Sequence, residues 1–228
     1  PGYPELAVKN LAELTGIDFK NSEDLIAATS DCGAYMTLSS AIKGLAVKMT
    51  KVCNDIRLLA SGPRCGLKEI NLPQLQPGSS IMPGKVNPVA AEVANQASFL
   101  AIGLDTTVML AASAGQLELN VMEPVITFAL YMQMKVLTNA CNHLREKCID
   151  GIVVNAEHCK DLVMGSLGIV TLLKPHFGYK PCANIAREGF LTGKSLHQLV
   201  VEEKGMLTQE QWDHTFTYEN LINPKFEK

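Results

Sequence analysis

The sequence has few aromatic residues, little net charge and no long hydrophobic run. Aromatic side chains make up 6% of the 228 residues, and the formal net charge at pH 7 is -3. Lysine and arginine are scattered rather than clustered, which gives no electrostatic case for nucleic-acid binding. No signal peptide and no apolar stretch of about twenty residues occurs, so the sequence predicts neither export nor membrane insertion. We therefore expect no nucleic-acid partner and no membrane partner.

The sequence also lacks the cysteine pattern of a disulfide framework or a metal site. Its 7 cysteines are odd in number and irregularly spaced, which favours reduced thiols in a cytoplasmic protein. Cys141, His143, Cys148, His158 and Cys159 follow one another closely, but no CxxC or HxxxH spacing exists among them. We expect core positions for the cysteines, surface positions for the histidines, and no metal or other cofactor.

What the sequence does contain is a long helical periodicity. Apolar residues alternate in steps of four and three over 38–59, and the same rhythm recurs over 90–111, with small residues, and over 130–144. This spacing is typical of helices that pack against a partner along their whole length. The pattern predicts an all-α fold built on a long-helix bundle, whose first helix, over 33–61, would be about 40 Å long.

Three such helices cannot bury all their apolar rows against one another. The bundle therefore needs further helices, from a partner subunit or from sequence outside this chain. A self-sufficient three-helix bundle remains the alternative.

The pattern divides the chain near residue 150. We expect residues 1–150 to form part of the helical bundle and residues 151–228 to form a small helical C-terminal domain, because its segments are short and separately capped. Ser22 is a plausible N-cap in the first part. Thr208, followed by Gln211, predicts a capping box in the second.

One irregular stretch, GSSIMPGKVNP over 78–88, interrupts the helices. Its glycines and prolines exclude a regular helix or strand. We expect Asn87 as the N-cap and Pro88 as the first residue of the next helix, whose electropositive end would attract an anion. A phosphate loop needs four residues between its glycines and a Ser or Thr after the lysine, and neither condition holds. A solvent-exposed linker is the alternative.

This stretch resembles the signature loop of the fumarase/aspartase superfamily, whose members eliminate a group from a succinyl-type substrate and release fumarate. Residues 54–64 resemble the end of a central helix in the same superfamily. Residues 29–32 and 115–124 resemble aspartases more than fumarases. The resemblance implies elimination of ammonia from L-aspartate by a cytoplasmic homotetramer, through a carbanion stabilised by the substrate carboxylate.

The resemblance also assigns roles within the stretch. It implies that Ser79 is the general base, that Lys85 and Asn87 contact the substrate carboxylate, and that Ser80 and Ile81 belong to the substrate site. A serine oxygen can lose its proton only if neighbouring groups stabilise the charge. We expect the N-H groups of Ser80 and Ile81 and the cation of Lys85 to provide that stabilisation.

Glu92 matches a glutamate that orients an active-site histidine in the superfamily. None of the 5 histidines here has the Gly-Arg-Thr-His context of that residue, and the other substrate-binding motifs of the family are also missing. We therefore expect this chain to be the carboxy-terminal half of an aspartase and to be inactive alone. The alternatives are a fumarate hydratase and a structural or assembly module that has lost catalysis.

Overall fold

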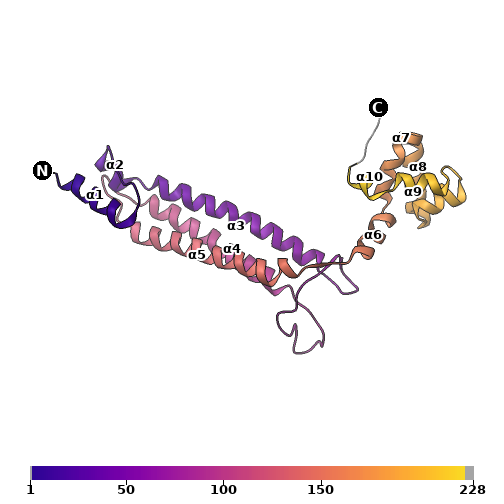
Figure 1. Cartoon of the computed structure of the whole chain (residues 1–228), viewed down its shortest axis with the longest axis horizontal. Coiled ribbons are helices and arrows are strands. Elements are labelled where there is room, and N and C mark those ends of the chain that lie inside the picture. Colours follow the sequence, from indigo (N-terminus) through magenta and orange to yellow (C-terminus); the bar gives the residue numbers. More distant parts are fainter. Residues whose placement is uncertain (1, 224–228) are drawn as a thin grey trace. The chain divides into compact units, whose positions relative to one another are not determined.

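The computed structural model describes residues 2–223; Pro1 and residues 224–228, which the expected domain ranges include, lie outside the described part. The chain divides into two compact units, Pro1–Val153 and Val154–Lys228. Helices dominate both (Figure 1), which confirms the all-α prediction. The first unit contains α1 (Tyr3–Thr15), α2 (Leu25–Ser30), α3 (Gly33–Leu59), β1 (Ile70–Asn71), α4 (Val89–Ala112), α5 (Glu123–Lys147) and the short helix η1 (Ile149–Gly151). The rest of the chain forms β2 (Val153–Val154), α6 (Ala156–Gly165), η2 (Leu167–Leu173), α7 (Lys174–Phe177), α8 (Tyr179–Thr192), η3 (Gln198–Glu203), α9 (Gln209–Thr215) and α10 (Tyr218–Ile222).

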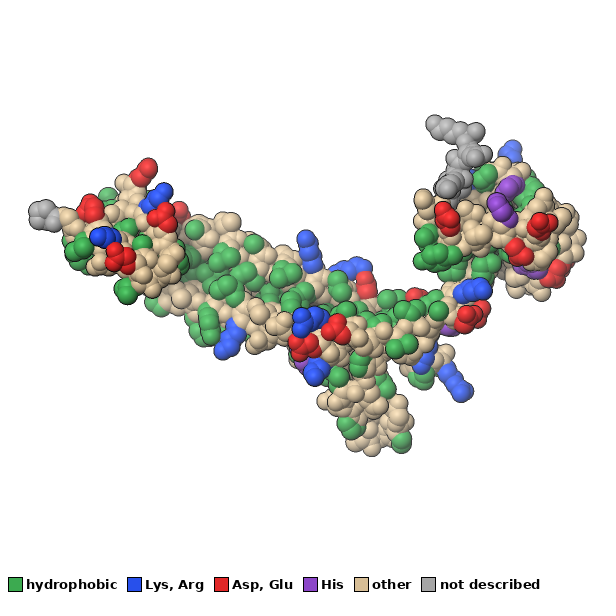
Figure 2. Space-filling model, viewed as in Figure 1, with side chains coloured by type: hydrophobic (Ala, Val, Ile, Leu, Met, Phe, Trp, Pro, Cys, Tyr) green, Lys and Arg blue, Asp and Glu red, His purple; other side chains and the backbone are tan. Residues whose placement is uncertain are grey.

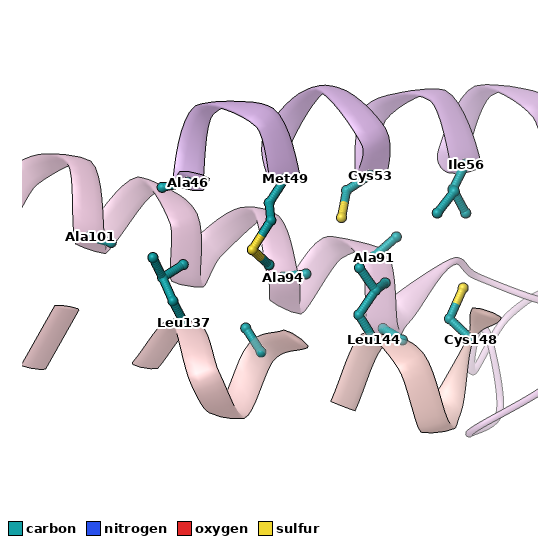
Figure 3. Close-up of a cluster of buried hydrophobic side chains, with 12 residues drawn as sticks. Ala46, Met49, Cys53, Ile56, Ala91, Ala94, Ala101, Leu137, Leu144 and Cys148 are labelled. Carbon is teal, nitrogen blue, oxygen red and sulfur yellow. The ribbon is translucent and has the colours of Figure 1, made fainter. Parts of the chain in front are cut away.

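The three long helices α3, α4 and α5 pack lengthwise in the first unit (Figure 1). Small side chains on α4, among them Ala94 and Ala101, let its neighbours approach closely. Figure 3 shows Met49 and Cys53 of α3 directed into the space between the helices, with Leu144 of α5 in the same cluster. The small-residue row predicted for the second long helix is therefore confirmed as a packing surface.

The apolar row predicted on α3 splits into two. Met49 and Ile56 are buried within the chain, whereas Leu38, Leu45 and Val52 are 45%, 49% and 49% exposed. Because these three lie seven residues apart, they form one line along the helix. Figure 2 shows hydrophobic side chains spread along the visible face of the helical part. Among residues 2–223, nothing covers this second apolar row on α3.

A buried polar cluster joins the same three helices. The Ser39 hydroxyl donates to Asp105 Oδ1 (2.7 Å), and Lys43 forms an ion pair with the other oxygen of that carboxylate. Gln133 Nε2 donates to the Ala101 carbonyl (2.9 Å) and lies 3.2 Å from the Ser39 hydroxyl oxygen. Burial raises the pKa of Asp105, but hydrogen bonds from Lys43 and Ser39 outweigh it and hold this pKa below its usual value. The cluster fixes one alignment of α3, α4 and α5, because sliding any helix would leave buried polar groups unpaired.

Two details near the N-terminus and in the cysteines differ from expectation. The cap of α2 is Asp24, whose carboxylate accepts from the N-H groups of Ile26 and Ala27, and not Ser22. Asp24 is better placed because it directly precedes the helix, while the Ser22 hydroxyl donates to the Asp24 carbonyl. Of the three cysteines for which core positions were predicted, Cys148 is buried and Cys159 is half-buried, but Cys141 is exposed.

The second unit has its own core, which includes Leu173, Leu199 and Trp212. The capping box predicted for α9 is present, with the Thr208 hydroxyl accepting from the Gln211 N-H group and the Gln211 side chain accepting from the Thr208 N-H group. The short helix η2 runs directly into α7, and α10 is only 5 residues long.

Replacing Asp105 with Asn should lower the free energy of unfolding by about 2 kcal/mol at pH 7, because it removes the charged acceptor of two hydrogen bonds. The folded-state pKa of Asp105 is lowered, so its stabilisation is present above the unfolded-state value of about 3.9 and is lost as the pH falls through the folded-state pKa. Urea unfolding followed by circular dichroism at pH 7 and below pH 3.9 would therefore show a smaller difference at the lower pH.

Asp18→Asn is the matched control, because Asp18 is exposed and its replacement should change stability by less than about 0.5 kcal/mol. Equal costs for Asp105→Asn at both pH values would contradict the prediction.

Candidate functional site

The segment between α3 and α4 leaves the helices as a long loop (Figure 1), and its last part closes on itself at a narrow neck. A Cβ atom added to Gly78 would lie 2.0 Å from the Lys85 carbonyl oxygen, so the two backbones touch there. The Asn87 side-chain amide donates to the Gly78 carbonyl (2.6 Å). Backbone contact and amide together hold residues 78–87 as a closed loop immediately before α4.

The neck corrects the role expected for Asn87. The helix α4 begins at Val89 with Pro88 as its N-cap and without a side-chain cap, so Asn87 does not cap it and Pro88 is not its first residue. The Asn87 amide is committed to the Gly78 carbonyl instead. Capping rules consider only residues within about one helical turn, so they could not predict a contact between residues nine apart. Asn is common both as a helix cap and in loops.

Ser79 is the first residue inside the neck and forms a tight turn. Its side-chain oxygen accepts hydrogen bonds from the backbone N-H groups of Ile81 and Met82, each at 3.1 Å. The N-H group of Ile81 donates to Ser79 as expected. The second donor is the N-H group of Met82 and not that of Ser80. Two fixed donors on one hydroxyl oxygen favour its negatively charged form, which is the requirement for a serine that accepts a proton from carbon.

Lys85 and Asn87 line a pocket with a volume of about 300 Å³ beside the neck. Its other wall comes from the chain that follows α3, including Gly62, Lys68 and Asn71. Ser79, Ser80 and Ile81 are outside the lining of this pocket. The structure thus brings the predicted carboxylate-binding residues together and leaves the predicted base on a separate turn of the same loop.

Lys68 is a lining residue that sequence reasoning missed. Residues 54–64 resemble the superfamily, but Lys68 lies beyond them and belongs to no sequence motif that predicts a binding role.

Glu92 lies in the first turn of α4, half-buried, outside the lining of that pocket. Of the histidines, only His143 belongs to the first unit, and it lies on α5, toward the end of that helix. The structure shows no contact between Glu92 and a histidine among residues 2–223, so the partner expected for Glu92 is not provided by the described part of this chain.

Another pocket, of about 920 Å³, lies in the second unit and is mostly apolar, with Ile169, Leu172 and Phe216 in its lining. Within residues 2–223 no group of three or more His, Cys, Asp or Glu side chains is placed to hold a metal ion. The same residues contain no helix long and apolar enough to cross a membrane.

Comparison with known proteins points to one group of lyases. A family model described as Lyase matches residues 1–103, and a model described as Fumarase C C-terminus matches residues 169–223. The chain is 55% identical to the aspartate ammonia-lyase of Escherichia coli strain K12, covering 98% of this chain and 47% of that protein. It is 50% identical to the aspartate ammonia-lyase of Helicobacter pylori strain 26695, covering 98% of this chain and 48% of that protein. The chain therefore spans about half the length of the curated relatives it matches.

The chain is also similar to solved structures of a fumarase and a fumarate lyase. The class II fumarase of Schistosoma mansoni is similar with a TM-score of 0.89 and 33% identity, covering 98% of this chain and 50% of that one. The fumarate lyase:delta crystallin of Brucella melitensis bound to cobalt is similar with a TM-score of 0.88 and 41% identity, covering 92% of this chain and 45% of that one.

Replacing Gly78 with Ala should open the neck, because the new methyl group would lie 2.0 Å from the Lys85 carbonyl oxygen. We expect faster amide hydrogen exchange across residues 79–87 and a loss of about 1–3 kcal/mol of stability. Hydrogen-exchange mass spectrometry would measure the first effect and urea unfolding the second.

Gly103→Ala is the matched control, because a Cβ atom added to Gly103 on α4 meets nothing within 4 Å. That variant should leave exchange in the loop unchanged. If Gly78→Ala also left it unchanged, the neck would not be what closes the loop.

Proposed function

Because the chain belongs to the fumarase/aspartase superfamily, we propose that it acts as part of an aspartate ammonia-lyase, which converts L-aspartate reversibly into fumarate and ammonia. The observation that supports this most directly is the Ser79 turn, in which one hydroxyl oxygen accepts from two backbone N-H groups. The high identity to two aspartate ammonia-lyases favours this reaction over others in the superfamily.

In the proposed reaction, Ser79 removes a proton from the methylene carbon of L-aspartate. This carbon is bonded to the carboxylate that lies farther from the amine. The electron pair left on that carbon spreads into the adjacent carboxylate as an aci-carboxylate. It then forms the double bond of fumarate as the carbon-nitrogen bond breaks and ammonia leaves. The N-H groups of Ile81 and Met82 stabilise the Ser79 oxygen when it lacks its proton, and they need no rearrangement to do so.

Lys85 and Asn87 are proposed to hold a substrate carboxylate at the pocket that they line. A lysine ammonium is a strong partner for a carboxylate that gains charge during the reaction. Ser80 and Ile81, at the exposed tip, are proposed to meet the substrate when the loop closes over it. Glu92 is proposed to orient a histidine that lies outside the described part of this chain.

We further propose that the complete protein is a homotetramer of the cytoplasm and uses no cofactor for this step. The exposed row on α3 supports assembly, because an uncovered line of apolar residues along a long helix favours a second helix beside it. Free cysteines in the described part, with Cys53 and Cys148 fully buried as thiols, support a reducing compartment.

A fumarate hydratase is the second candidate, because the class II fumarase of Schistosoma mansoni shares the fold. Addition of water to fumarate passes through the same kind of carbanion. Assays of the complete protein with L-aspartate and with malate distinguish the two. A module that has lost catalysis would act on neither.

Replacing Ser79 with Ala should reduce turnover of L-aspartate by the complete protein by about 10²-fold or more, because the general base is removed. Fumarate formation is followed by ultraviolet absorbance. Ser113→Ala is the matched control, because Ser113 lies at the far end of α4 and its hydroxyl donates only to a carbonyl of that helix.

Unchanged turnover in the Ser79 variant would rule out this base even if the reaction itself were confirmed. Consumption of malate but not L-aspartate by the wild-type protein would establish the hydratase instead.

Replacing Leu45 and Val52 with Gln should shift the protein toward smaller species in analytical ultracentrifugation, because both side chains are 49% exposed on the uncovered row. Leu14→Gln is a control with an exposed leucine on α1, outside that row. A wild-type protein that sediments as a monomer and melts cooperatively would contradict the proposed assembly.

A further inference from the structure

His197, in the second unit, faces an oxygen atom at each of its ring nitrogens. It is half-buried and directly precedes η3. Its Nδ1 atom lies 3.1 Å from Oε1 of Glu202, and its Nε2 atom lies 2.8 Å from Oε1 of Gln209, at the start of α9. A neutral imidazole has one N-H group and one lone pair, so it can donate to only one of these oxygens. The imidazolium form donates to both.

The orientation of the Gln209 amide is fixed by Asp213. The Nε2 atom of Gln209 donates to Oδ1 of Asp213, one turn later on α9, at 2.9 Å. Turning the amide over would place its oxygen against this carboxylate, which only accepts hydrogen bonds when it is ionised. The amide oxygen is therefore directed at His197, where a neutral ring nitrogen without a proton would face it unfavourably.

The backbone of η3 brings Glu202 to the ring. This segment is a π-helix, in which the Lys204 N-H group donates to the Leu199 carbonyl at 3.1 Å, five residues back. Residues five apart are neighbours in a π-helix, whereas in an α-helix the neighbours are three and four apart. His197 and Glu202 are five residues apart, so the π-helical turn is what makes them neighbours. Such turns are rare and occur frequently at functional sites.

The charged residues that follow Glu202 already have partners. Two ion pairs involve them, Glu203 with Lys194 (2.6 Å) and Lys204 with Glu188 (2.9 Å). The contact of His197 with Trp212 of α9 is aromatic, with ring centroids 5.1 Å apart and an angle of 84° between the rings. His197 thus faces one carboxylate directly, that of Glu202, and a second one, that of Asp213, through the Gln209 amide.

We propose that these residues form a proton-dependent clasp, in which the imidazolium of His197 joins η3 to α9 and the neutral ring weakens this connection. A histidine in an unfolded chain has a pKa of about 6.5. Because only the imidazolium satisfies both acceptors, the stabilisation is present below that value and is lost as the pH rises and the folded-state ring loses its proton. The clasp therefore holds α9 more firmly near pH 6 than near pH 8. This inference is independent of the proposed reaction.

Amide hydrogen exchange of residues 209–216, measured by mass spectrometry on the complete protein, reports how firmly α9 is held. Dividing each rate by that of an unfolded peptide at the same pH removes the intrinsic effect of pH on exchange. We expect protection in the wild type to fall about threefold from pH 6 to pH 8, because a partly exposed ion pair is lost. His197→Arg keeps its charge at both pH values and should keep its protection. His197→Gln should have the lower protection at both.

Asp213→Asn tests the role given to the Gln209 amide. An asparagine side chain can donate as well as accept, so Gln209 can turn over and donate to the neutral ring. The fall in protection between pH 6 and pH 8 should then be smaller than in the wild type.

His214→Gln is the matched control, because His214 is exposed in the last turn of α9, where its own charge favours the helix end. That variant should keep the fall seen in the wild type. The inference is overturned if the wild type shows no fall, if His197→Arg falls as much as the wild type, if Asp213→Asn leaves the fall unchanged, or if His214→Gln abolishes it.

Discussion

The close approach of the Gly78 backbone to the Lys85 carbonyl is the constraint on which the site depends. Only a residue without a side chain fits there, since a methyl group would lie 2.0 Å from the carbonyl oxygen. Because the two ends of the loop are in contact, the Asn87 side chain can donate across the neck to the Gly78 carbonyl. The neck places the Ser79 turn on the loop side and Lys85 on the pocket side. The proposed base and the proposed carboxylate-binding cation thus lie on two short segments that one contact holds together.

The helical frame explains why that neck has a fixed position. The helix α4 begins two residues after Asn87 and is held between α3 and α5 by small side chains. The buried cluster of Ser39, Asp105 and Gln133 fixes the alignment of the three helices with directional hydrogen bonds, which apolar contacts alone do not provide. Apolar packing supplies most of the stabilisation, and the polar cluster selects one register. The start of α4, and the loop before it, are therefore set by contacts far along the bundle.

The sequence predicted the features that depend on spacing along one helix, and missed those that depend on two distant segments. The three long helices follow from apolar periodicity, and the capping box at Thr208 follows from residues three apart. The exposed row on α3 could not be separated from the buried one, because both have helical spacing and only the positions of the neighbours decide which is covered. The same limit hid the pairing of Ser39 with Asp105, which are 66 residues apart, and the presence of Lys68 in the pocket wall. Asn87 was misassigned because a helix cap and a loop neck both favour asparagine.

Ser79 is separate from the pocket, which fits a loop that closes during the proposed reaction. The donors to the Ser79 oxygen come from Ile81 and Met82, within three residues of it, so the turn can move as a unit without losing a hydrogen bond. The neck at Gly78 is anchored to α4 through Asn87 and the short connection to Val89. A movement about that neck would carry Ser79, the proposed base, toward the pocket in which Lys85 and Asn87 are proposed to hold the substrate carboxylate. The geometry that stabilises the charged oxygen would then be the same before and after closure, so no hydrogen bond of the turn has to be rebuilt when the proton is transferred.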